Sequence, residues 1–177
     1  MTYHAQPVRA TGPRRQPAAE VRSADPGELS DVLQFMRLLW AVDHGLQSTS
    51  KRMNRDLGVT GPQRLVIRVV GRFPGISAGE LASVLHVHPS TLTGVLARLI
   101  ERRLLSRTPH PHDRRRTLLR LTEQGRRLDK LNAGTVESAV RQALRATSPA
   151  DHAAAGRLLA RIAESLERDQ GTPILQR

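Results

Sequence analysis

Several side chains in the middle of the chain belong to types that recognise nucleic acids. Three consecutive arginines, Arg114 to Arg116, follow His112 and Asp113, and the guanidinium fork matches phosphate oxygens and the edge of guanine. Upstream, small polar side chains precede an apolar run, and such groups can reach base edges. Our candidates for contact with double-stranded DNA are His88, Ser90, Thr91, Thr93, Arg98, Arg107, His112, Asp113, Arg114, Arg115 and Arg116.

The excess of positive charge is concentrated around these residues. The 177 residues contain 28 Lys and Arg against 16 Asp and Glu, a net charge of +12. Residues 86–120 hold eight arginines against Glu101 and Asp113, so this segment carries half of the excess. A basic segment of this kind is the electrostatic footprint of nucleic-acid binding.

The composition argues against several other classes of protein. Aromatic residues make up 2% of the chain, too few to stack along a single strand. Cysteine is absent, which excludes disulfides, thiolate metal sites and thiol-based sensing. We expect neither an enzyme nor a resident cofactor or metal, because no phosphate-binding loop or zinc-protease motif occurs. We also expect no membrane span and no export signal, because long apolar runs are missing.

Short capped helices and a hairpin are predicted to position the candidate residues. Capping-box pairs, Thr60 with Gln63 and Ser77 with Glu80, begin two helices that end near Gly71 and Leu85. A third helix begins at Pro89 and ends near Arg102. The Leu- and Thr-rich segments 104–108 and 117–121 predict a β-hairpin whose tip, 109–116, is basic.

This order of elements is that of a winged helix-turn-helix, mainly α with a small β-hairpin wing (α+β). The helix that begins at Pro89 would enter the major groove, and the hairpin tip would reach the adjacent minor groove. A module of the same shape could instead bind protein, although the run Arg114–Arg116 argues against that alternative.

Long amphipathic helices are predicted on both sides of the module, over 28–57, 122–146 and 148–169. Their apolar stripes have no partner within the module, so we expect a homodimer that buries them in a symmetric interface. Two recognition helices about 34 Å apart would then read a palindromic site. The predicted domains are a disordered basic tail (1–27), a dimerisation helix (28–57), the winged helix-turn-helix (58–121), the C-terminal dimerisation helices (122–170) and a tail (171–177).

Several motifs at these positions resemble the MarR family of bacterial transcription regulators. They are Leu81-Ala82, the helix start 89–93, the segment 99–107, Asp113-Arg114-Arg115 in the wing, and 121–125, which reads Leu-Thr-Glu-Gln-Gly. The resemblance covers about residues 28–169. It implies a cytoplasmic, nucleoid-associated homodimer, usually a repressor, in which Asp113 orients Arg115 by a salt bridge and an arginine of the wing tip enters the minor groove.

The chain departs from the family pattern in three places. Gly94 stands where many members carry arginine, which removes a DNA contact from the recognition helix. Arg103 stands where glycine often closes that helix, so we expect the left-handed cap to be strained or replaced. The run Pro109-His110-Pro111-His112 predicts a stiff, histidine-rich entrance to the wing.

Two hypotheses for an effector remain open. The resemblance implies a small aromatic or phenolic ligand, for which Met36, Trp40, His44 and Arg68 could line a pocket; alternatively, Met36 and Trp40 are simply core residues. The chain also has seven histidines, so a metal-responsive regulator with His and carboxylate ligands is the alternative. Against it, no pair of histidines has the i, i+4 spacing of a helical metal site.

Overall fold

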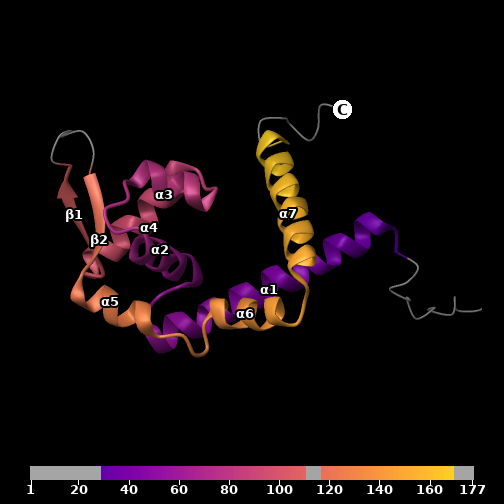
Figure 1. The fold of residues 1–177 in the computed structure, drawn as a ribbon, viewed down its shortest axis with the longest axis horizontal. Helices are drawn as coiled ribbons and strands as arrows, with labels where there is room; N and C mark the ends of the chain where they lie inside the picture. Colours follow the sequence, from indigo (N-terminus) through magenta and orange to yellow (C-terminus); the bar gives the residue numbers. More distant parts are fainter. Residues whose placement is uncertain (1–28, 111–116, 170–177) are drawn as a thin grey trace, which may run out of the picture. The chain divides into compact units, whose positions relative to one another are not determined.

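A computed structural model of the chain describes residues 29–110 and 117–169 (Figure 1). The predicted tails and the hairpin tip with His112 to Arg116 lie outside the described residues. The contacts divide the chain into two units, one up to Leu39 and one from Trp40 onward. The elements are α1 (Asp31–Leu57), α2 (Gly61–Arg72), α3 (Ala78–Leu85), α4 (Pro89–Glu101), β1 (Leu105–Pro109), β2 (Thr117–Leu121), α5 (Glu123–Lys130), α6 (Val136–Arg145) and α7 (Pro149–Asp169).

The two predicted capping boxes are confirmed. At α2, the Gln63 amide donates to Thr60 Oγ1 and the Thr60 amide donates to Gln63 Oε1. At α3, Ser77 and Glu80 exchange the same pair of hydrogen bonds. Each box satisfies amides that the first helical turn leaves without a partner, which is why both helices begin where the sequence predicts.

The wing is a two-stranded antiparallel sheet in the predicted place. Leu105 pairs with Leu121 at its base and Pro109 with Thr117 at its outer end. The segment before α3 adds a short third pairing that sequence patterns did not predict, because Leu119 exchanges backbone hydrogen bonds with Gly75 and Ile76. β2 therefore pairs with the segment before α3 as well as with β1, and this second pairing attaches the wing to the helix-turn-helix.

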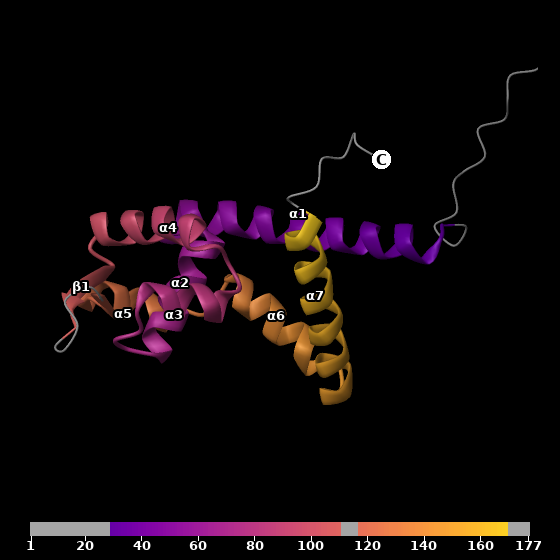
Figure 2. The same ribbon diagram turned by 90° about the horizontal axis from the view of Figure 1, so that it is seen from above.

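The hydrophobic core lies where α2, α3, α4 and the sheet meet, and the same elements group together in the second view (Figure 2). Leucines of α4 and of the strands interdigitate with the apolar stripe of α2. The buried side chains include Val66, Ile67, Val70, Leu81, Leu92, Leu96, Leu99, Leu105 and Leu119. This core holds α4 by its apolar face and leaves the opposite face free.

The prediction of one continuous helix over 122–146 is wrong. α5 ends at Lys130, and α6 begins at Val136 with Thr135 as its N-cap. Between them, Leu131 is extended and Gly134 has φ +70°, a left-handed conformation that suits glycine. The described ranges therefore contain seven helices where the sequence predicted six.

The apolar stripes of α6 and α7 are exposed. Leu144, Leu158 and Leu159 are each about half exposed, and Leu166 more so. In α1, Trp40 and Val42 are exposed too, while Met53 is buried. In the part of the chain that the structure describes, no helix is long and apolar enough to cross a membrane.

Candidate DNA-reading surface

The turn between α3 and α4 presents the first residues of α4 to solvent. His86 ends α3 in a left-handed conformation, with φ 49° and ψ 48°. The Val87 amide closes the turn by donating to the Ala82 carbonyl at 3.1 Å. Leu81 on α3 and Leu92 on α4 are buried in the core, so the helices on both sides of the turn are anchored there.

His88 is the N-cap of α4. Its Nδ1 accepts a hydrogen bond from the Ser90 amide at 3.3 Å and lies 2.7 Å from Ser90 Oγ. His88 thus caps the helix through Nδ1.

The polar residues of α4 lie on the face that the core does not cover. Ser90, Thr91 and Thr93 are exposed, whereas Leu92 between them is buried. The Thr93 hydroxyl donates to the Pro89 carbonyl at 2.9 Å. The predicted base-reading residues therefore share one exposed helix end, which is the part of a recognition helix that meets base edges.

Exposed arginines flank this helix end. Arg98 lies in the last turn of α4, Arg107 on β1 opposite Leu119, and Arg120 on β2 opposite Ser106. Within the described residues none of the three is in an ion pair. Cations without acidic partners are available to phosphate.

Of the two alternatives that the sequence leaves open at Arg103, a strained cap or a replaced one, the structure has the strained cap. Its φ is +55°, so it takes the left-handed cap position after α4 without the freedom of glycine. Its amide donates to the Ile100 carbonyl at 2.8 Å, and the next amide, of Leu104, donates to the Leu99 carbonyl at 2.9 Å. These two bonds have the pattern of a left-handed helix end, which arginine adopts at an energetic cost.

The base of the wing is joined to α5 by a close backbone contact. The Thr122 amide donates to the Leu104 carbonyl at 3.1 Å, and the Thr122 hydroxyl donates to the Arg103 carbonyl at 2.6 Å. Thr122 Oγ1 also accepts from the Gly125 amide and so caps α5. A Cβ on Gly125 would lie 2.1 Å from the Leu104 oxygen. The approach of helix to strand therefore requires glycine at this position.

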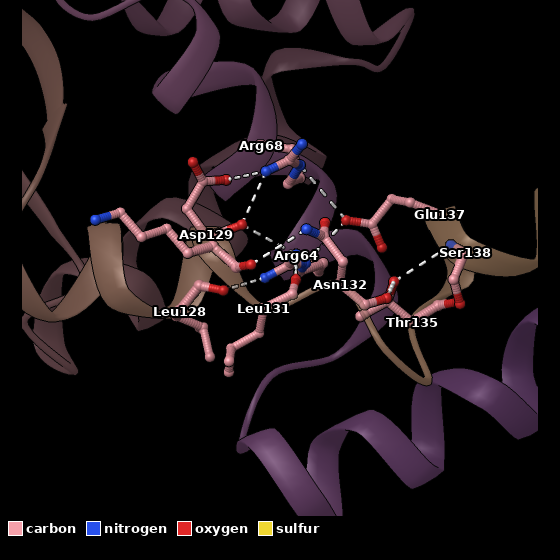
Figure 3. Close-up of polar contacts among 10 residues, drawn as sticks. Arg64, Arg68, Leu128, Asp129, Leu131, Asn132, Thr135, Glu137 and Ser138 are labelled. Carbon is pink, nitrogen blue, oxygen red and sulfur yellow. Dashed lines mark hydrogen bonds and ion pairs between the residues drawn. The ribbon is translucent and has the colours of Figure 1, made fainter. Parts of the chain in front are cut away.

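A buried arginine joins α2 to the break between α5 and α6 (Figure 3). Arg64 is 1% exposed. Its Nε donates to Glu137 Oε1 at 2.8 Å, Nη1 donates to the Leu128 carbonyl, and Nη2 donates to the Asp129 and Leu131 carbonyls. Burial raises the pKa of Glu137, but hydrogen bonds from its own backbone amide and from Arg64 outweigh burial and hold that pKa below its usual value.

Sequence reasoning missed Arg64. The available signal was an arginine that directly precedes the apolar run of α2, at a position where the stripe faces the core. A charged side chain there must find partners in another element, because a buried unpaired charge is costly. Its partners lie more than sixty residues away in sequence, so no local pattern identifies them.

Of the residues proposed for an effector pocket, three are exposed to solvent and the fourth, Arg68, is bound to Asp129. Trp40 is 78% exposed, and Met36 and His44 are exposed as well. Arg68 Nη1 donates to the carbonyl and to Oδ1 of Asp129, both at 2.8 Å. Among the described residues, no hydrogen bond or ion pair joins Arg68 to Trp40 or His44. The described part of the chain also contains no group of three His, Asp or Glu side chains that could hold a metal ion.

Comparisons with known proteins show what this part of the chain is similar to. Residues 57–116 match the sequence model of the MarR family, while no curated protein sequence matches the chain. The crystal structure of MarR is 26% identical, covers 76% of this chain and 98% of its own, and superposes with a TM-score of 0.54.

Two further solved structures share the fold at lower identity. Staphylococcus aureus MepR in complex with DNA is 17% identical over 75% of this chain and 97% of its own, with a TM-score of 0.62. Streptomyces coelicolor PcaV in complex with its natural ligand is 24% identical over 81% of this chain and 98% of its own, with a TM-score of 0.60. The matched segment spans the helix-turn-helix and the first strand of the wing, so this part of the chain is similar to the MarR family, and the fold is that of the MarR-type winged helix-turn-helix proteins.

Proposed function

We propose that the protein binds double-stranded DNA in a sequence-specific manner and regulates transcription, as a repressor. The observation that carries this proposal is the exposed polar end of α4, flanked by arginines that have no acidic partner among the described residues. The MepR structure was determined in complex with DNA, which supports the same role here. The protein would act in the bacterial cytoplasm, at the nucleoid.

Each group of residues has a separate proposed task. His88, Ser90, Thr91 and Thr93 would read base edges in the major groove. Arg98 and Arg107 would contact phosphates, and these contacts would position the helix without reading sequence. His112 and Asp113 to Arg116 would form the wing tip, with Asp113 orienting Arg115 into the minor groove.

We propose that the active form is a homodimer on a palindromic operator. The exposed apolar stripes of α1, α6 and α7 support it, because side chains such as Leu158 and Leu159 would otherwise stay in water. A single charge in such a stripe should separate the protomers. We expect Leu159→Asp to sediment as a monomer and to lose operator binding, whereas a variant that remained a dimer would place the interface elsewhere.

We further propose that a small aromatic or phenolic ligand releases the DNA. PcaV was solved with its natural ligand, which supports an effector in a protein of this fold. A pocket at Met36, Trp40, His44 and Arg68 would have to compete with the Arg68–Asp129 ion pair. Trp40 is the only tryptophan, so its fluorescence reports a ligand that binds beside it. Release of DNA without any change in that fluorescence would argue for a different pocket.

Fluorescence anisotropy with genomic fragments tests DNA binding directly. We expect the logarithm of the affinity to fall linearly and steeply with the logarithm of salt concentration. Arg115→Ala should weaken binding to every sequence, whereas Thr91→Ala should cost about 1–3 kcal/mol and change the preferred sequence. Arg145→Ala removes the same charge from α6 and serves as the control. Binding that does not depend on salt, or no binding to any fragment, would refute the proposal.

A further inference from the structure

The break between α5 and α6 depends on a competition for backbone carbonyls. In a continuous α-helix each carbonyl accepts from the amide four residues later, so Leu128, Asp129 and Leu131 would pair with the amides of residues 132, 133 and 135. In this structure Arg64 donates to all three carbonyls instead. The guanidinium therefore binds the carbonyls that a continuous helix would use. Arg68 also donates to the Asp129 carbonyl at 2.8 Å, and the Leu131 amide donates to the Leu128 carbonyl at 3.1 Å. The two arrangements therefore compete for the same carbonyls.

The first amides of the break lack a backbone acceptor. Among the described residues, no backbone carbonyl accepts from Asn132 or Ala133, and residues 133–134 form a hydrogen-bonded turn. The segment is held by side chains, since the Thr135 hydroxyl donates to the Asn132 carbonyl at 2.9 Å and Thr135 Oγ1 accepts from the Ser138 amide at 3.3 Å. These groups cap a new helix and do not extend the old one.

The apolar spacing favours the continuous arrangement, although Gly134 and the N-cap Thr135 favour a break. Leu128, Leu131, Val140 and Leu144 recur at helical spacing, which is why a single helix is predicted there. The break leaves Leu131 and Leu144 about half exposed. The apolar spacing and the contacts made by Arg64 are therefore opposed at 131–135, and Arg64 adds a tertiary contact to the local signals for a break.

Arg64 is built into the module that carries α4. It lies on α2, beside Val66 and Ile67 of the core, and its ion pair with Glu137 contacts the first turn of α6. Arg68, one turn later, adds an ion pair to Asp129 at the end of α5. Arg64 thus contacts both sides of the break from the DNA-reading module.

We propose that Arg64 is a positioning residue that keeps the helix interrupted at 131–135 and thereby sets the separation of the two recognition helices in the dimer. The first half of this proposal concerns the chain alone. The second half rests on the proposed function, because α6 and α7 carry the stripes assigned to the dimer interface.

Hydrogen exchange measured by mass spectrometry on the full chain tests the first half. In Arg64→Met we expect the amides of residues 132–135 to exchange roughly tenfold or more slowly than in the wild type, because they gain helical acceptors. If Arg64 only stabilised the fold, its loss would make these amides exchange faster. The control is Arg72→Met, which removes the same charge from an exposed position on the same helix.

A second variant shifts the balance between the interrupted and the continuous helix without changing Arg64. Gly134→Ala has free space around its Cβ, but it disfavours the left-handed backbone at φ +70° and favours a continuous helix. We expect the same slowing of exchange at residues 132–135. The control is Gly79→Ala on α3, which also has free space. Faster or unchanged exchange in both Arg64→Met and Gly134→Ala would overturn the proposal.

A series of DNA duplexes tests the second half. Inverted half-sites are separated by spacers that increase one base pair at a time, and a duplex with a single half-site serves as the reference. We expect both variants to shift the preferred spacer by at least one base pair while single half-site affinity changes less than about twofold. An unchanged spacer preference alongside slowed exchange would refute the link to spacing. Failure of the wild type to bind DNA would refute the proposed function alone.

Discussion

Replacing Gly125 by alanine should destabilise the contact between the wing and α5. The new Cβ would lie 2.1 Å from the Leu104 carbonyl oxygen, whereas a close carbon–oxygen contact is about 3.3 Å. The backbone would have to separate by about 1 Å to relieve this overlap. Side-chain rotation offers no relief, because the obstructing atom belongs to the backbone of the buried residue Leu104.

The expected loss of stability follows from two costs and one gain. Overpacking in a filled interior costs about 1–3 kcal/mol. Loss of the hydrogen bond from the Thr122 amide to the displaced carbonyl costs about 0.5–1.5 kcal/mol, while the higher helix propensity of alanine returns up to about 1 kcal/mol. We therefore expect Gly125→Ala to lower the free energy of unfolding by about 2 kcal/mol.

Urea unfolding followed by circular dichroism, at one fixed protein concentration, measures this loss. With a slope near 2 kcal/mol per molar urea, the midpoint should fall by about 1 M. The control is Gly94→Ala, an exposed position in α4 with nothing within 4 Å of the added Cβ; it should leave stability unchanged or raise it by up to about 1 kcal/mol. If the two variants unfolded at the same urea concentration, the reasoning from the Leu104 contact would be wrong.

Three further predictions concern residues elsewhere in the chain. Arg103→Gly should stabilise the protein by about 0.5–1 kcal/mol, because the left-handed cost of a side chain exceeds the entropic cost of glycine; a lower melting temperature would contradict it. Thr60→Ala should cost about 1 kcal/mol through loss of the α2 cap, measured by the same urea titration. Because the folded-state pKa of Glu137 is lowered, its stabilising effect is present above about pH 4.5 and disappears as pH falls through the folded-state pKa. In Glu137→Gln, the free energy of unfolding should therefore fall less steeply as the pH is lowered below about 4.5. If it fell as steeply as in the wild type, Glu137 would not be the cause of the loss.

The sequence alone determined the elements whose signals are local. The capping boxes at Thr60 and Ser77 begin α2 and α3, and Pro89 begins α4. Each depends on side chains within one helical turn, so the pattern contains its own physical cause. The hairpin was predictable from two Leu- and Thr-rich segments that flank a polar stretch, and its strands pair close in sequence.

Tertiary structure decided what depends on partners far away in the chain. The apolar spacing over 122–146 predicts one helix, but Arg64 takes the carbonyls at the end of α5 and Thr135 starts a new helix. Arg64 and Glu137 are 73 residues apart, so the contact exists only once the core has brought α2 beside α5 and α6. A buried guanidinium must satisfy its donors wherever the fold provides acceptors, and this requirement overrides local helix preference.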